Sequence, residues 1–172
     1  MKIIDDKSNF GSISDNEELW NESMSSDRSA ALVASAAFDT HLERILLKHL
    51  LFENSKGKKL LNSTLSSFSA RINTCFCLGL IDEDEYHDLN LFRDIRNSFA
   101  HNLFECNFKN EKVKVAIENL KCVKNFRSEK HKEESKLKFL LGVMLLDKSL
   151  VMRLSKTSKA QRPDELDFKK SS

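Results

Sequence analysis

The chain has 172 residues, of which 40% are hydrophobic and 31% charged, and its formal net charge is +2. This length suits one domain with a substantial core, and so small a net charge argues against a general nucleic-acid binder. The chain has only four glycines and one proline, Pro163, and no long run alternates as a β-strand does. We therefore predict an all-α fold, a bundle of about five helices.

The charges are unevenly distributed. Residues 1–27 carry two lysines and seven acidic residues, whereas residues 109–172 carry seventeen basic and nine acidic residues. The basic end is explained by a solvated helix face and a loose tail, or alternatively by a surface for RNA or another anionic partner. The amino terminus lacks an apolar signal core and no window of about 18 apolar residues exists, so we expect a soluble, cytoplasmic protein without a membrane contact.

The first part of the chain is predicted to be an acidic flexible arm over residues 1–24, with a short helix near residues 16–24 that carries Trp20. A long helix should follow over residues 27–52, capped by a serine or Asp27 at its start. Its alanine-rich segment 30–37 lets neighbouring helices approach closely, so this helix should be central in the bundle. On its flank, His41 and His49 are expected to be surface or structural histidines.

The rest of a helical domain, residues 25–155, is expected to contain four further helices. Lysine-rich residues 54–64 should form a solvated connection. The four helices are predicted over residues 65–78, 82 to 101 or 103, 110–123 and 135–155. Their inward apolar residues are predicted to include Phe76 in the first of them and Leu137 and Leu145 in the last. Residues 124–134 should form a loop, and residues 156–172 a polar, basic tail.

The helix expected from residue 82 has the clearest signals. Asp82 and Glu85 have the spacing of a capping box, and Gly79 is a plausible stop for the helix before it. One apolar stripe is formed by Tyr86, Leu89, Phe92, Ile95 and Phe99. A second face carries a polar row of Asn90, Arg93, Asn97 and His101, with Arg96 about 100° away from Asn97. We predict that this row, together with Asn102, is a binding surface, because a simple core helix does not need it.

The four cysteines do not have the spacing of a metal site. Cys75 and Cys77 are separated by one residue of a predicted helix, so they point to different sides, and no second pair completes a zinc site. The other two, Cys106 and Cys122, are distant in sequence. We expect reduced, mostly buried thiols, no metal and no cofactor.

Several segments resemble the mannitol-operon-repressor (MltR-like) family. The similarity covers about residues 25–155 and lies in the following runs: DRSAALVASA at 27–36, LSSFSARI at 65–72, LGLID at 78–82, YHDLNLFRDIRNSFAH at 86–101 and ENL at 118–120. The resemblance implies an all-helical bundle without a separate DNA-binding domain. It also implies a bacterial transcriptional regulator of the repressor type that acts through another protein.

A shorter run, Arg96-Asn97-Ser98-Phe99-Ala100-His101, is similar to the Arg-x4-His motif of HEPN domains. Many of these domains are dimeric, metal-independent endoribonucleases of toxin–antitoxin and defence systems, and others are inactive. The resemblance implies that Arg96 and His101 would be the catalytic pair and Asn97 the supporting polar residue. Histidine can transfer a proton near neutral pH, and a guanidinium binds phosphate oxygens through a planar fork.

The same residues also have a purely structural interpretation. Arg96 could pair with Asp88, with Asp94 or with a carboxylate on a neighbouring helix. His101 and Asn102 could satisfy backbone groups at the end of their helix.

Three classes of function follow from these observations. The first is a non-enzymatic regulator that binds a protein partner. The second is a metal-independent ribonuclease that uses Arg96 and His101, and the third is an antitoxin or immunity protein whose acidic residues 5–27 cover a basic partner. We place the regulator first because the family resemblance covers far more residues than the motif. We also expect a homodimer, from the small-residue helix and the resemblance, and no sequence-specific DNA contact.

Overall fold

The computed structural model describes residue 12 and residues 17–50, 55–101, 106–124 and 135–160, and these ranges contain helices and no strand. The predicted all-α fold is therefore confirmed. The helices are as follows: α1 (Glu17–Ser25), α2 (Asp27–His49), α3 (Ser55–Asn62), α4 (Phe68–Cys77), α5 (Glu83–His101), α6 (Glu111–Glu118) and α7 (Ser135–Lys156). In the described ranges no helix is both long and apolar enough to cross a membrane.

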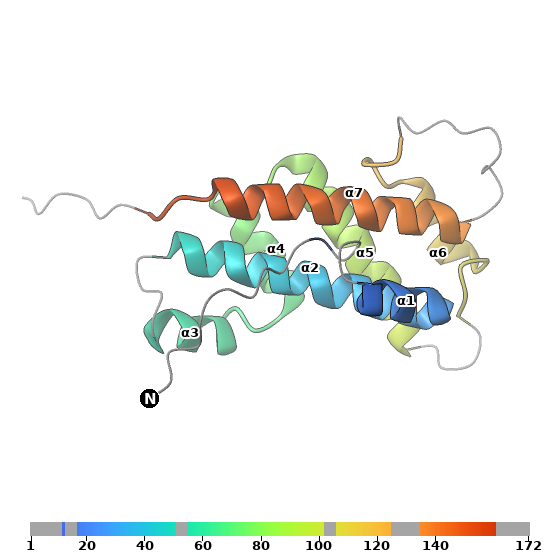
Figure 1. Ribbon diagram of the computed structural model, residues 1–172, viewed down its shortest axis with the longest axis horizontal. Coiled ribbons are helices and arrows are strands. Elements are labelled where there is room, and N and C mark those ends of the chain that lie inside the picture. Colours follow the sequence, from blue (N-terminus) through green and yellow to red (C-terminus); the bar gives the residue numbers. More distant parts are fainter. Residues whose placement is uncertain (1–11, 13–16, 51–54, 102–105, 125–134, 161–172) are drawn as a thin grey trace, which may run out of the picture.

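Helices α2 and α7 lie side by side and run in the same direction (Figure 1). Near their amino ends, the Lys136 ammonium lies 3.3 Å from the Asp27 carboxylate. Near their carboxyl ends, Lys48 donates a hydrogen bond of 2.8 Å to the carbonyl of Leu154. Helix α2 also packs against α1, α4 and α5, so its predicted central position is confirmed.

The two histidines of α2 make internal contacts. Nε2 of His41 lies 2.9 Å from Oδ1 of Asp147, and both side chains are buried between α2 and α7. Nδ1 of His49 lies 2.9 Å from the carbonyl oxygen of Ser158. The structural interpretation of these histidines is therefore confirmed.

Local sequence signals set several helix ends as predicted. The Asp82 amide donates to the Glu85 carboxylate, and the Glu85 amide donates back to Asp82, each over 2.9 Å. This is a complete capping box at the start of α5. After α4, Gly79 has a φ of +66°, a conformation that glycine adopts without strain. At the start of α2, Ser26 is the N-cap residue and accepts from the Ser29 amide.

The structure contains one helix that the sequence analysis did not predict, α3. Residues 54–64 were expected to be a solvated connection, but α3 occupies residues 55–62 because Leu61 is fully buried against the core. The short helix expected near residues 16–24 is confirmed as α1, and Trp20 packs partly buried against the core. Helix α6 ends at residue 118, earlier than expected. The proposed flexibility of residues 1–11 concerns a segment outside the described residues.

The core confirms the apolar stripe of α5, because Leu89, Phe92, Ile95 and Phe99 are all at most 1% exposed. The alanines of α2 that suggested a homodimer, Ala30, Ala31 and Ala34, are buried inside the chain's own core. They therefore pack helices of one chain together.

Three predicted core residues are wrong. Phe76 is 38% exposed and stacks on Tyr86, with ring centroids 4.3 Å apart. On α7, Leu137 and Leu145 are 40% and 38% exposed. The core-facing side of α7 instead contains Gly142, where an added Cβ would lie 3.1 Å from Leu120.

The four cysteines differ in exposure, which predicts their reactivity. All four are free thiols; Cys75 is buried and Cys77 is exposed. Burial raises the pKa of the Cys75 thiol to about 12, so only about one molecule in 10⁴ would carry the thiolate at pH 8. Burial also raises the pKa of Cys122 and of Cys106.

With an aromatic disulfide reagent at pH 8, we expect one fast-reacting thiol per folded chain, Cys77, and slow reaction of Cys75 through unfolding. The variant Cys77→Ser should lack the fast phase, and urea should make the remaining thiols react rapidly. A fast phase that persists in Cys77→Ser would contradict this assignment. The absorbance of the released thiol measures each phase.

Candidate functional site at the carboxyl end of helix α5

The last turns of α5 present the three polar side chains that the sequence analysis singled out. Arg96 and His101 are exposed and Asn97 is half-buried. Nη1 of Arg96 donates a hydrogen bond of 3.0 Å to Oδ1 of Asn97. Neither Arg96 nor His101 is enclosed in the apolar interior, so both remain accessible to a partner.

Helix geometry places two of these groups on one face, and a hydrogen bond draws the third toward them. Asn97 and His101 are four positions apart, so they lie on one face, one turn from each other. Arg96 leaves the helix about 100° away from Asn97, and its hydrogen bond turns the guanidinium toward the Asn97 side chain. The cluster therefore combines a guanidinium, an amide and an imidazole at the end of a packed helix.

The carboxylates proposed as structural partners of Arg96 are engaged elsewhere. Oδ1 of Asp94 lies 3.0 Å from Nη2 of Arg93. Asp88 is 1% exposed and accepts backbone hydrogen bonds from Lys121 and its neighbour. Among the described residues, Arg96 forms no ion pair.

The rest of the predicted polar row makes contacts within the fold. Nδ2 of Asn90 donates over 2.8 Å to the carbonyl of Tyr86, one turn earlier. Nη1 of Arg93 donates over 3.1 Å to the Ser69 hydroxyl on α4. Asn90 and Arg93 thus stabilise α5 and its contact with α4. Asn102, also predicted to belong to the surface, lies outside the described residues.

The structure adds a residue that sequence reasoning did not assign to this place. Arg28, in the first turn of α2, donates from Nη1 to the carbonyl of Phe99, 71 positions along the chain. Its neighbour Asp27 accepts a hydrogen bond of 3.1 Å from the amide of Phe108. The first turn of α2 therefore contacts both the last turn of α5 and the described segment that begins at residue 106.

The opposite end of α5 is acidic, but three of its carboxylates form ion pairs with basic residues elsewhere in the fold. Nζ of Lys121 lies 2.6 Å from Asp84, and this hydrogen bond lowers the pKa of Asp84 and raises that of Lys121. Arg153 of α7 contacts both Glu85 and Asp82, and its hydrogen bond with Glu85 raises the pKa of Arg153. These contacts join α5 to its neighbours and leave the carboxyl end as the accessible polar end.

The chemistry open to this cluster is the binding of anionic or hydrogen-bonding groups. A guanidinium donates two parallel hydrogen bonds to a carboxylate or phosphate, and an imidazole can donate, accept or transfer a proton. Within the described residues, no three His, Cys, Asp or Glu side chains are placed to hold a metal ion.

Comparisons with known proteins agree with this architecture. The sequence model of the family described as "Mannitol repressor" matches residues 15–159. Among solved structures, a chain of the X-ray structure of the MtlR–HPr complex from Escherichia coli has a TM-score of 0.62 and 18% sequence identity, over 81% of this chain and 97% of that one. At this identity the likeness shows a shared fold. A search of curated protein sequences finds no match. Because the family match spans most of its length, the chain belongs to the mannitol repressor family.

Proposed function

We propose that this protein is a regulator that acts by binding another protein and that its partner is an HPr protein. The observation that carries the proposal is the family match over residues 15–159. It is supported by the similar fold of a chain in the X-ray structure of the MtlR–HPr complex. The scattered basic residues, without a recognition-helix motif, also favour contact with protein over direct reading of DNA.

We place the binding surface at the carboxyl end of α5, on Arg96, Asn97 and His101. Arginine is enriched among the residues that contribute most to interface affinity. The cluster is held on a rigid support, because Arg28 binds the carbonyl of Phe99 in the same turn of α5. A rigid donor set loses little conformational freedom on binding, which favours affinity.

Titration calorimetry with HPr from the same organism tests the proposal. We expect the full chain to bind HPr and the variants Arg96→Ala and His101→Ala each to bind about tenfold or more weakly, the loss typical of an interface contact of about 1.4 kcal/mol or more. The control is the variant Lys58→Ala, which removes an exposed lysine of α3 and should leave the affinity for HPr unchanged. A full chain that shows no interaction with HPr by calorimetry or gel filtration would reject this partner.

Repression of transcription is the expected consequence of this binding. In cells, we expect expression of the chain to lower transcript levels of the mannitol operon, and Arg96→Ala to restore them at equal protein abundance. Purified chain alone should not retard a promoter fragment in a gel. Specific retardation by the chain without a partner would instead show that it binds DNA directly.

Metal-independent cleavage of RNA is a second candidate, favoured by the joint exposure of Arg96 and His101 and by the hydrogen bond of Arg96 to Asn97. Attack by a ribose 2′-hydroxyl needs proton transfer, for which His101 is suited, and charge stabilisation at phosphate, for which Arg96 is suited. A symmetric dimer would supply a second histidine.

Incubation of the chain with total RNA in the presence of a chelator tests this candidate. The ribonuclease hypothesis predicts cleavage that His101→Ala lowers by about 10²–10⁴-fold, the range typical of general acid–base catalysis. Intact RNA, or equal cleavage by wild type and variant, excludes the site as a ribonuclease.

A further inference from the structure

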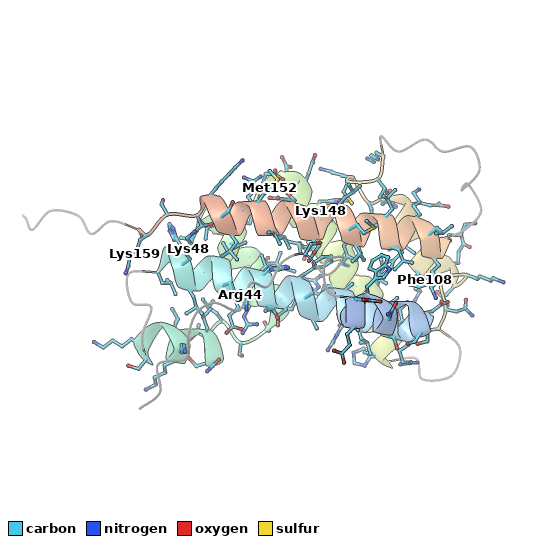
Figure 2. The ribbon with its side chains drawn as sticks, viewed as in Figure 1. Arg44, Lys48, Phe108, Lys148, Met152 and Lys159 are labelled. Carbon is cyan, nitrogen blue, oxygen red and sulfur yellow. The ribbon has the colours of Figure 1, made fainter. Side chains whose placement is uncertain are left out.

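Helix α7 has a row of four apolar side chains and one lysine on the side away from its buried residues. The row, called here the outer stripe, consists of Leu137, Leu141, Leu145, Lys148 and Met152. Steps of four, four, three and four positions place these residues within about one quarter of the helix circumference. Leu137, Leu145 and Met152 are 40%, 38% and 55% exposed, and Leu141 is half-buried. Lys148 and Met152 are labelled along α7 in Figure 2.

The opposite face of α7 provides all of its fully buried contacts. Phe139, Val143, Leu146 and Leu150 are at most 3% exposed, on the side where α7 packs against α2 and α6. This face therefore anchors the helix, and of the outer stripe Leu141 adds a partly buried contact with the core. The outer stripe exposes three large apolar side chains along one side of a single helix, and an uncovered apolar patch on a protein surface is often a binding site.

The exposed charge on α7 has a single sign. The helix has one acidic residue, Asp147, and its side chain is completely buried. Two of the basic residues, Lys136 and Arg153, are paired with carboxylates of other helices. Three basic residues of α7 form no ion pair with another described residue: Lys138, Lys148 and Lys156. An apolar stripe with unpaired lysines in and beside it requires a partner that is apolar and acidic.

We propose that the outer stripe binds an amphipathic helix of another protein, with apolar side chains along one face and acidic side chains beside them. A second copy of this chain fits less well, because pairing two α7 helices would bring lysines against lysines. A membrane surface also fits less well, since the stripe lacks tryptophan and phenylalanine and its side chains are only partly exposed. Met152 suits a protein partner because its flexible thioether adapts to different apolar shapes. This surface is distinct from the end of α5, and the proposal is independent of HPr binding.

A synthetic helical peptide tests the proposal directly. The probe is a fluorescein-labelled peptide of three heptads with leucine at positions a and d and glutamate at e and g, and binding to the full chain is followed by anisotropy. A matched peptide with lysine for each glutamate and another with glutamine are the controls. We expect the glutamate peptide to bind at least tenfold more tightly than the lysine peptide, with affinity that falls as salt is raised.

Variants of the stripe locate the site. Leu145→Ser and Met152→Ser should each weaken peptide binding about tenfold, and Lys148→Glu should weaken it further through charge repulsion. Val115→Ser on α6 removes an equally exposed apolar side chain (45%) and should leave binding unchanged. All four positions are at the surface, so circular dichroism is expected to show folded variants.

The following outcomes overturn the proposal. The glutamate peptide does not bind, or the lysine peptide binds as tightly as the glutamate peptide, or Val115→Ser weakens peptide binding as much as the stripe variants do. If sedimentation shows that the chain is a dimer and that Leu145→Ser makes it a monomer, a second copy of the chain occupies the stripe. The chain could instead bind phosphatidylglycerol vesicles and not the peptide. If Met152→Ser abolishes that vesicle binding, the stripe contacts lipid.

Discussion

Replacement of Asp147 by alanine is expected to destabilise the protein by about 1–3 kcal/mol, the usual cost of leaving a buried polar group without its hydrogen-bond partner. The Asp147 side chain is completely buried, His41 is 2% exposed, and their polar atoms lie 2.9 Å apart. Nδ1 of His41 is buried and has no hydrogen-bond partner among the described residues. Without Asp147, both ring nitrogens of His41 would be buried without a partner.

Urea unfolding monitored by circular dichroism measures this loss as a change in the free energy of unfolding. The control is the double variant His41→Leu with Asp147→Leu, which replaces both polar groups by apolar ones. It should recover most of the stability, because replacing both partners by apolar side chains leaves no buried polar atom unpaired. A loss below about 1 kcal/mol in Asp147→Ala would mean that the pair contributes little to the packing of α2 on α7.

Replacement of Asp88 by alanine is expected to cost about 3 kcal/mol or more. The carboxylate is 1% exposed and accepts backbone hydrogen bonds of 2.8 Å from both Lys121 and Cys122. Hydrogen bonds to a charged acceptor contribute about 1.5–3 kcal/mol each. The variant removes the acceptor and leaves two partly buried amides to find other partners.

A nearby carboxylate provides the control for Asp88. Asp84 also contacts Lys121, but its side chain is 71% exposed and solvent screens the contact, so Asp84→Ala should leave the free energy of unfolding nearly unchanged. We further expect Asp88→Ala to make the Cys122 thiol react faster with an aromatic disulfide reagent, since the segment that holds it is released. Equal unfolding free energies for the two variants would show that Asp88 does not anchor this segment.

Local signals made α5 predictable. Its capping box, its single apolar stripe and the glycine before it all act within a few residues, and each has the predicted role in the structure. Helix α7 was predicted with nearly correct bounds, but its inward face was predicted only in part: Leu137 and Leu145 are exposed, whereas Leu140 is buried as predicted. It carries leucines on both sides, so periodicity alone cannot choose between them, and the packing of Gly142 and Asp147 against other helices decides.

The candidate site was predicted only in part, for a similar reason. His101 is exposed, as its place in the polar row of α5 predicts, and Arg96 is exposed about 100° away from Asn97 of that row. The engagement of Arg93 with Ser69, and of Arg28 with the end of α5, depends on contacts between helices. These contacts join residues up to 71 positions apart, and no periodicity in the sequence records them.

Nuclear magnetic resonance most directly tests the central claim that the carboxyl end of α5 binds a partner protein. Backbone amide shifts of the isotopically labelled full chain would be followed during titration with unlabelled HPr. We predict that the largest shifts fall on residues 93–101 and on Arg28, which contacts the same turn. The claim would be contradicted if a saturating concentration of HPr left these resonances unshifted. It would also be contradicted if the only shifted resonances belonged to helices remote from this end.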